Sequence, residues 1–281
     1  MKFSDIYDNK KGKHIISYEV FPPKNDMDFT GLYQTIEDLK DINPDYVSVT
    51  YGAGGSNRDK TLEIASTIKN KMGIEVATHL TCVNATIQDT DTMLERFKNE
   101  PKFCPQFHLS LQSGCDATLK RMNRHYDTAF YRDLVGRIRA KFENASITTD
   151  IMVGFAGESE EEFNESLAFY KEIGFARGHV FAYSRRAGTV AAALKNQVEE
   201  AVKTHRARLM GDAAKASEEA FVKTQIGTKA KVLFETYNDG FNEGYSENYL
   251  RLYIKDYCGG KVEKVKVLSP FKDGALAEIK E

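Results

Sequence analysis

The sequence has no apolar run approaching the roughly 18–20 residues that a helix needs to cross a bilayer. Its first residues, MKFSDIYDNKKGKH, also lack the apolar core of a signal peptide. Neither sign of charge dominates, because 39 Lys and Arg residues are balanced by 41 Asp and Glu residues, a formal net charge of −2. Any binding to nucleic acid therefore has to come from a local patch. We expect a cytoplasmic protein without membrane contact.

Cysteine is scarce and irregularly placed. The four cysteines are Cys82, Cys104, Cys115 and Cys258. Their spacing matches no zinc site, thioredoxin-type pair or iron–sulfur motif. In a reducing cytosol such residues are free thiols in most proteins, so we expect no metal site. Cys82 and Cys115 follow neighbouring predicted strands and are expected near each other, but two thiols do not hold a cluster.

Strand and helix patterns alternate over most of the 281 residues. The expected strands cover residues 15–21, 46–51, 75–82, 107–111, 147–155 and 179–183. Repeated strand–helix units predict a parallel sheet with crossover helices. We therefore expect an α/β fold, a TIM-like (β/α) barrel of about six parallel strands over residues 1–222. Chemistry in such a barrel is expected at the carboxyl ends of the strands.

The pattern changes after a long, charged helix predicted at residues 198–222. Four short alternating segments follow, separated by turns rich in Gly, Asn and Asp. They cover residues 229–235, 249–254, 261–268 and 275–279. This arrangement is typical of a small all-β barrel. We place a domain boundary near 222–226, so that residues 223–281 form a second domain.

Three motifs stand at the ends of the first three expected strands. They are SYEVFPPK at 17–24, VSVTYGAGG at 47–55 and ATHLTC at 77–82. In order and spacing they resemble methylenetetrahydrofolate reductase, over roughly residues 1–100. The resemblance implies a flavoprotein (β/α) barrel that reduces methylenetetrahydrofolate with a nicotinamide donor. It also implies that Glu19 is the acid assisting at the folate nitrogen, and that Thr50 and His79 contact the FAD.

Glu19 is compatible with a catalytic and with a structural role. A carboxyl group at a barrel mouth, shielded by Phe21 and Pro22, is suited to hold a proton near neutrality. A strand-end carboxylate paired with a neighbouring Lys or Arg fits the same residues. His79, taken alone, is equally consistent with an ordinary strand-end histidine.

From Phe103 onward the motifs belong to a different family. They are FCPQFHLSLQSGCDATLKRMNRHY at 103–126, TTDIMVGFAGESEEEF at 148–163 and HVFAYSRRAGT at 179–189. These resemble the radical-SAM tRNA methylthiotransferases, above all the type that acts on threonylcarbamoyladenosine. The tail at about 222–281, with GYSENY at 244–249, is similar to the TRAM β-barrel that grips tRNA in that family.

The second resemblance implies S-adenosylmethionine packed across the strand ends. The matching positions are Ser110, Gln112, Arg121, Val153, Gly154 and Tyr183. Without the resemblance, the same residues are compatible with barrel core, a strand cap or a solvated cation.

The partner implied by the tail is tRNA. Cations and aromatic residues interleave there, which suits contact with an RNA backbone and stacking on bases. We expect the contacts at Lys231, Tyr245, Tyr249 and Arg251. Acidic residues nearly cancel the charge, so we expect weak, salt-sensitive binding. A solvated β-domain whose tyrosines pack its own core fits the same pattern.

The two resemblances meet at residues 98–105, which we interpret as the seam of a chimera. Neither site is complete, since the C-x3-C-x2-C motif that holds a [4Fe–4S] cluster is missing, as is that family's amino-terminal domain. The reductase-like part ends before the strand that carries an aspartate near the flavin. We therefore expect no cluster, at most weak binding of FAD or S-adenosylmethionine, and no turnover. The alternatives are a reductase-class flavoprotein with a degraded site and a scaffold that binds no ligand. The origin of the join stays open.

Overall fold

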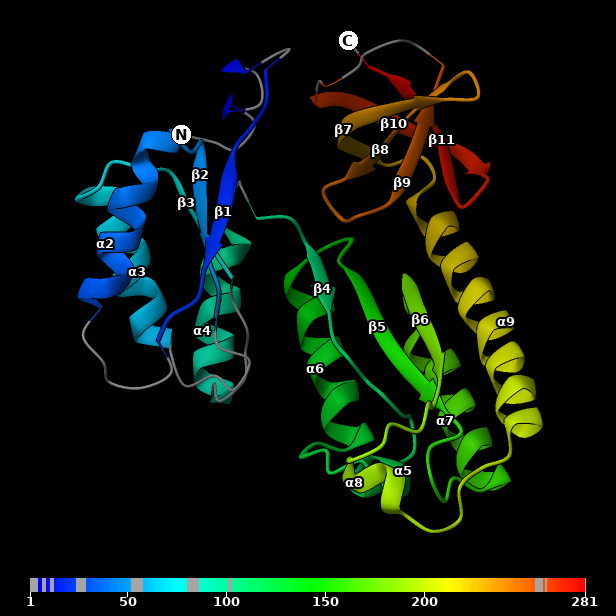
Figure 1. The fold of residues 1–281 in the computed structure, drawn as a ribbon. Helices are drawn as coiled ribbons and strands as arrows, with labels where there is room; N and C mark the ends of the chain where they lie inside the picture. The colour runs from blue at the N-terminus through cyan, green and yellow to red at the C-terminus, as the bar shows by residue number, and fades with distance from the viewer. Residues whose placement is uncertain are drawn as a thin grey trace. The chain divides into compact units, whose positions relative to one another are not determined.

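The structure is a computed structural model that describes residues 5–6, 9–10, 13–23, 29–51, 58–79, 86–100, 103–255, 260 and 262–280. Figure 1 shows the order of its helices and strands. The chain divides, within helix α4 (Ile87–Lys98), into two compact units, Met1–Met93 and Leu94–Glu281. Each unit is described in turn.

The first unit contains a parallel sheet of three strands in the order β1-β2-β3. The strands are β1 (Ser17–Val20), β2 (Tyr46–Val49) and β3 (Val76–Thr78). Helix α2 (Thr30–Asp38), the 3-10 turn η1 (Leu39–Ile42) and helix α3 (Arg58–Asn70) connect them. A small apolar core forms where the helices supply Ile36, Ile64 and Ile68 against Val47 and Val49 of β2. Alternate residues of β2 are buried, as expected for a strand covered on one face.

The second unit opens with another parallel sheet, in the order β4-β5-β6. Its strands and helices are β4 (Gln106–His108), α5 (Asp116–Arg121), α6 (Thr128–Lys141), β5 (Ser146–Val153), α7 (Glu160–Ile173), β6 (Arg177–Ala182), α8 (Val190–Ala193) and α9 (Glu200–Gln225). Helix α7 begins at a capping box, because Ser159 and Glu162 satisfy each other's backbone N–H groups. It ends at Gly174, whose left-handed φ of 64° suits glycine.

The two faces of this sheet differ in character. One face packs on the helices, and its core includes Phe163 and Tyr170 of α7, Val135 of α6 and Met210 of α9. The residues of β4, β5 and β6 that alternate with the core positions are polar and at least partly exposed in most cases. We call this second side the polar face. It consists of Gln106, His108, Ser110, Thr148, Asp150, Arg177 and His179.

The remaining strands form a closed barrel of mixed antiparallel and parallel pairing, in the order β10-β11-β9-β8-β7. They are β7 (Lys229–Asn238), β8 (Phe241–Ser246), β9 (Arg251–Ile254), β10 (Val262–Phe271) and β11 (Gly274–Ile279). Alternate residues point inward, so that Val232, Phe234, Leu252, Val265 and Val267 fill the interior.

The mixed α/β fold with parallel strands, followed by an all-β barrel, is confirmed. In the described residues the parallel strands form two sheets of three, so the single barrel of about six strands stays a prediction. Strand β8 was not expected, because its inward positions are Asn242, Gly244 and Ser246 rather than apolar residues. A polar strand of this kind carries no period-2 hydrophobic signal.

Helix α9 is attached to the sheet by a buried ion pair. The guanidinium of Arg206 donates to the carboxylate of Glu158 at 2.8 Å, and both side chains are almost fully buried. Glu158 also accepts from the backbone N–H of Gly154 at 2.6 Å, at the end of β5. Burial raises the pKa of Glu158, opposed by these two contacts. The pair therefore joins the end of β5 to the start of α9.

The Arg206–Glu158 pair leads to a test of stability. We expect Arg206→Met to lower the free energy of unfolding by about 3 kcal/mol, because the Glu158 carboxylate would stay buried without its partner. Urea denaturation followed by circular dichroism measures the change. The control is Arg208→Met, which removes an exposed pair with Asp212 at 3.7 Å and should cost less than about 1 kcal/mol. Equal losses in both variants would contradict the importance of the buried pair.

A second test concerns the close approach of β8 to β7. A Cβ atom on Gly244 would lie 2.1 Å from the carbonyl oxygen of Leu233, and backbone does not yield easily. We expect Gly244→Ala to destabilise the protein by about 2 kcal/mol, the usual scale of overpacking. Gly136 of α6 has no atom within 4 Å of such a Cβ, so Gly136→Ala should stabilise it by about 0.5–1 kcal/mol. Thermal melts should show shifts of opposite sign.

Candidate functional site

The polar face of the second sheet carries a network of side-chain hydrogen bonds. His108 Nε2 lies 3.0 Å from Ser110 Oγ and 3.2 Å from Asp150 Oδ2, and Ser110 donates to Asp150 at 3.2 Å. His108 Nδ1 lies 3.1 Å from Thr148 Oγ1, which also accepts from Gln106. These contacts arise because residues two apart on β4 and β5 share one face. The network can donate and accept hydrogen bonds to a polar ligand.

Two of the predicted S-adenosylmethionine positions, Ser110 and Gln112, lie at this network. Ser110 is a member of it through its bonds to His108 and Asp150. Gln112 adopts a left-handed φ of 65° just beyond β4, and its backbone pairs with β5 through Asp150 and Met152 at 2.8 Å each. The structure thus brings Ser110 and Gln112 to the carboxyl end of the strands.

Three further predicted positions lie together but are covered. Val153 and Tyr183 are buried, and the N–H of Tyr183 donates to the carbonyl of Val153 at 2.9 Å. The methylene chain of Lys203, from α9, lies 2.4 Å from the place where a Cβ on Gly154 would be. The Lys203 ammonium lies 5.5 Å from the Tyr183 ring centroid, a cation–π contact. A ligand that packed on Gly154 would have to displace Lys203.

Arg121, the sixth predicted position, is held in an ion pair within the chain. Its guanidinium forms a two-armed ion pair with Glu162 and also donates to Thr118 at 2.9 Å. The hydrogen bond from Arg121 is the main cause that lowers the pKa of Glu162. Arg121 therefore fastens α5 to the start of α7 and is not brought together with Ser110.

The first sheet holds its own polar cluster across three strands. Ser48 of β2 donates to Glu19 of β1 at 3.2 Å, and its oxygen lies 3.1 Å from Nε2 of His79, just beyond β3. Glu19 and His79 themselves approach to 3.3 Å, and both are about half exposed. Thr50 is 9% exposed, with its backbone bonded to Val20 and its carbonyl accepting from Thr61. Glu19 and His79 are thus brought together, and Thr50 lies inside.

The predicted RNA contacts lie on the barrel. The rings of Tyr245 and Tyr249 stack with centroids 4.5 Å apart and planes 15° from parallel, and Tyr249 is 55% exposed. Lys231 pairs with Glu247 at 3.1 Å. Arg251 donates to Asp273 and Glu243, and these hydrogen bonds, the one to Asp273 first, raise its pKa. The guanidinium of Arg251 stays charged, and the carboxylates of Asp273 and Glu243 compensate most of that charge.

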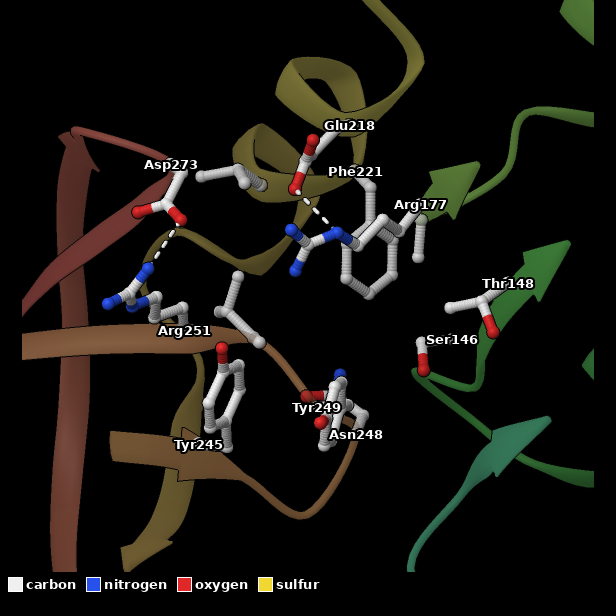
Figure 2. A pocket seen from close by; sticks show the side chains of 13 residues that line it. Ser146, Thr148, Arg177, Glu218, Phe221, Tyr245, Asn248, Tyr249, Arg251 and Asp273 are labelled. Carbon is white, nitrogen blue, oxygen red and sulfur yellow. Dashed lines mark hydrogen bonds and ion pairs between the residues drawn. The ribbon is translucent and has the colours of Figure 1, made fainter. Parts of the chain in front are cut away.

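A small cavity lies beside the tyrosine stack (Figure 2). Tyr245, Tyr249 and Arg251 line one side of it, and Arg177 and Glu218 line the other. Its volume of about 20 Å³ holds no more than a single water molecule. An RNA base would therefore contact the exposed outer surface of the stack and not this cavity.

Two of the four cysteines lie in the described part of the chain. Cys104 and Cys115 are free thiols there, and burial is the first cause that raises the pKa of each. The expected approach of Cys82 to Cys115 lies outside the described residues, as do the glycines at 52–55. Across the described ranges, no group of three His, Cys, Asp or Glu side chains is arranged to hold a metal ion.

Several site residues were not predicted from the sequence. They are Ser48, His108, Thr148, Asp150, Glu158 and Lys203. For His108 a signal existed, since polar residues alternate with apolar ones in HLSLQ at 108–112. For Asp150 there was none, because TTDIMV at 148–153 does not alternate. For Lys203 there was none, because its burial depends on how α9 crosses the sheet.

None of the helices described is long and apolar enough to span a bilayer.

Comparison with known proteins finds two kinds of relative. Residues 2–150 match the methylenetetrahydrofolate reductase family. A threonylcarbamoyladenosine tRNA methylthiotransferase of Thermotoga maritima is 34% identical over 190 residues, 67% of this chain and 43% of that protein. A tRNA-2-methylthio-N(6)-dimethylallyladenosine synthase of Lachnoclostridium phytofermentans is 38% identical over 150 residues, 53% of this chain and 33% of that protein.

The chain thus spans less than half the length of these curated relatives. Among solved structures, coproporphyrinogen III oxidase of Escherichia coli, a radical SAM enzyme, matches with a TM-score of 0.50 at 11% identity. That match covers 77% of this chain and 56% of the other, and at such low identity it shows a shared fold alone. The family match and the 190-residue alignment are together longer than the chain, so they overlap. By its residues 2–150 the chain belongs to the methylenetetrahydrofolate reductase family, and over a longer stretch it is also similar to tRNA methylthiotransferases.

Proposed function

We propose that the chain binds tRNA through its C-terminal barrel, a TRAM-like domain, and performs no radical chemistry. On this proposal it is a chimera joined at residues 98–105, with a reductase-like first part and a longer part derived from a tRNA methylthiotransferase. The names of the curated relatives supply the substrate class, which is tRNA.

The observation that carries the proposal is the exposed stack of Tyr245 and Tyr249. Two parallel rings held against each other offer a preformed platform, and every nucleobase has a π-face that can add to it. Tyr249 has a left-handed φ of 63° in the turn after β8, which holds its ring toward β8. Lys231 lies on β7, two residues before Leu233. Leu233 is paired with Tyr245 in the register of β7 and β8, so Lys231 is close to the stack.

The state of the strand ends supports the absence of turnover. Lys203 covers Gly154, Arg121 is bound to Glu162, and Val153 and Tyr183 are buried. Of the expected cofactor contacts, only Ser110 and Gln112 are therefore left partly exposed and without such a cover. The sequence also holds no C-x3-C-x2-C spacing among its four cysteines. Partial contact of this kind favours weak binding of S-adenosylmethionine, because the ordering cost is met in full while contacts are lost.

One observation favours a second function, that of a reductase-type flavin site. Glu19, Ser48 and His79 form a connected acid–hydroxyl–imidazole cluster at the strand ends of the first sheet. A flavin contact through His79 and a proton donor at Glu19 would use this cluster.

The tRNA proposal is tested by filter binding of bulk tRNA to the full chain. We expect binding at about 50 mM KCl that weakens at least tenfold by about 200 mM, the response of a site with several phosphate contacts. Tyr249→Ala should weaken binding by about tenfold, since a base stacked on an aromatic ring contributes about 1–3 kcal/mol.

Two variants serve as controls for Tyr249→Ala. Tyr249→Phe keeps the ring and should bind like the parent chain. Tyr237→Ala removes a ring of similar exposure, 58%, from the part of β7 remote from Lys231, and should also leave affinity unchanged. An absence of tRNA binding at low salt would falsify the proposed function.

The reductase alternative is tested with FAD. We expect about 100 µM FAD to raise the melting temperature by less than about 1 °C, since a ligand near its Kd adds well under 1 kcal/mol. A yellow purified protein, or a rise of several degrees that His79→Ala abolishes, would favour the flavin site instead. Thr204→Ala, a change in α9 outside both sites, controls for nonspecific effects.

A further inference from the structure

Five lysines gather on the outer surface of the barrel where β7, β10 and β11 run side by side. We call this set the lysine ladder, and it consists of Lys229, Lys231, Lys264, Lys266 and Lys280. On β7 and β10 these residues alternate with inward-pointing Val232, Val265 and Val267, so their side chains point outward.

The register places the lysines directly opposite one another. Lys231 of β7 is paired with Lys264 of β10, and Lys229 with Lys266. The N–H of Lys280 donates to the carbonyl of Lys264 at 2.9 Å, so it continues the row across β11. One row of the ladder thus contains Lys231 on β7, Lys264 on β10 and Lys280 directly after β11.

Such an arrangement works against the stability of the barrel. Like charges directly opposite each other on neighbouring strands repel and destabilise the sheet. Lysines on a strand are often explained by protection of an open edge against aggregation. That explanation does not apply here, because β7 pairs with both β8 and β10 and the barrel is closed.

Acidic neighbours neutralise only part of the charge. Glu247 pairs with Lys231 at 3.1 Å, and Glu278 lies opposite Lys266 on β11. Among the described residues that pair with or lie opposite one another here, five lysines against two glutamates leave a surplus of three positive charges, within a chain whose formal net charge is −2. The positive charge is therefore concentrated locally.

The ladder adjoins an apolar row that leads to the tyrosine stack. Leu233 and Val262, 42% and 52% exposed, lie opposite each other one step further along β7 and β10. Leu233 is in turn opposite Tyr245 on β8. Exposed apolar side chains therefore connect the ladder with the Tyr245–Tyr249 platform on one continuous surface.

We propose that the lysine ladder is a binding site for a chain of phosphates, the phosphodiester backbone of the RNA whose bases stack on Tyr249. The assignment of the phosphate chain to RNA rests on the proposed function. Ammonium groups in cross-strand rows contact successive phosphates and read no sequence. Binding of the polyanion also removes the repulsion that the register imposes.

The test compares the parent chain with the double variant Lys264→Gln/Lys266→Gln, using bulk tRNA and base-free inorganic polyphosphate as probes. For tRNA, we expect the slope of log K against log salt to fall in magnitude by about 1.5, close to one unit per lost phosphate contact. Affinity at about 50 mM KCl should fall about tenfold. Polyphosphate should raise the melting temperature of the parent by several degrees and that of the variant by much less.

The matched control is Lys215→Gln/Lys223→Gln, which removes the same charge from exposed positions on α9. It should keep the parent's salt slope and polyphosphate response. The melting temperature of the ladder variant without ligand should equal or exceed the parent's, which confirms that it folds.

The outcomes separate the ladder from the proposed function. If the salt slope and the polyphosphate response of the ladder variant are unchanged, the ladder is not a phosphate site, even if Tyr249→Ala weakens tRNA binding. A ladder-dependent response to polyphosphate without tRNA binding supports the ladder as a phosphate site and overturns the proposed function. Equal losses in the ladder and α9 variants show a general charge effect and also overturn the ladder.

Discussion

The second unit depends on one buried contact, the ion pair between Arg206 and Glu158. A carboxylate with almost no exposure costs free energy unless it is paired, and here a guanidinium and a backbone N–H share it. Because Arg206 belongs to α9 and Glu158 follows β5, the pair sets where the long helix crosses the sheet. Lys203, one turn earlier on α9, is thereby held above Gly154.

The same helix connects the sheet with the barrel. Further along α9, Ser217 donates to the carbonyl of Phe175 at 2.7 Å, and Gln225 accepts from Asn248 of the barrel at 3.0 Å. Asn248 also donates to the carbonyl of Asn144, just before β5. Polar contacts at both ends of the helix explain why α9 buries charged and amide side chains that an ordinary amphipathic helix would expose.

The sequence was sufficient for the alternation of strands and helices up to α9 and for the polar character of several strand-end residues, but not for every strand of the barrel. Glu19 and His79 were expected at the ends of the first and third strands, and they lie 3.3 Å apart; their role stays a prediction. The seam and the expected barrel of six strands also stay predictions. Periodicity could not find β8, whose inward side is polar, nor the burial of Lys203, which is a tertiary effect. The lysine ladder depends on strand register, and register follows from pairing that the sequence does not state.

The position of Lys203 also affects the affinity of any ligand that binds at the strand ends. A ligand that packs on Gly154 can bind only those molecules in which the lysine has moved away. Its apparent Kd is therefore the intrinsic value divided by the fraction of open molecules. With about one molecule in a hundred open, the apparent affinity falls about a hundredfold, although every direct contact with the ligand is intact. The buried lysine thus competes with any such ligand from within the same molecule. Because it is part of the chain, diluting the protein does not weaken this competition.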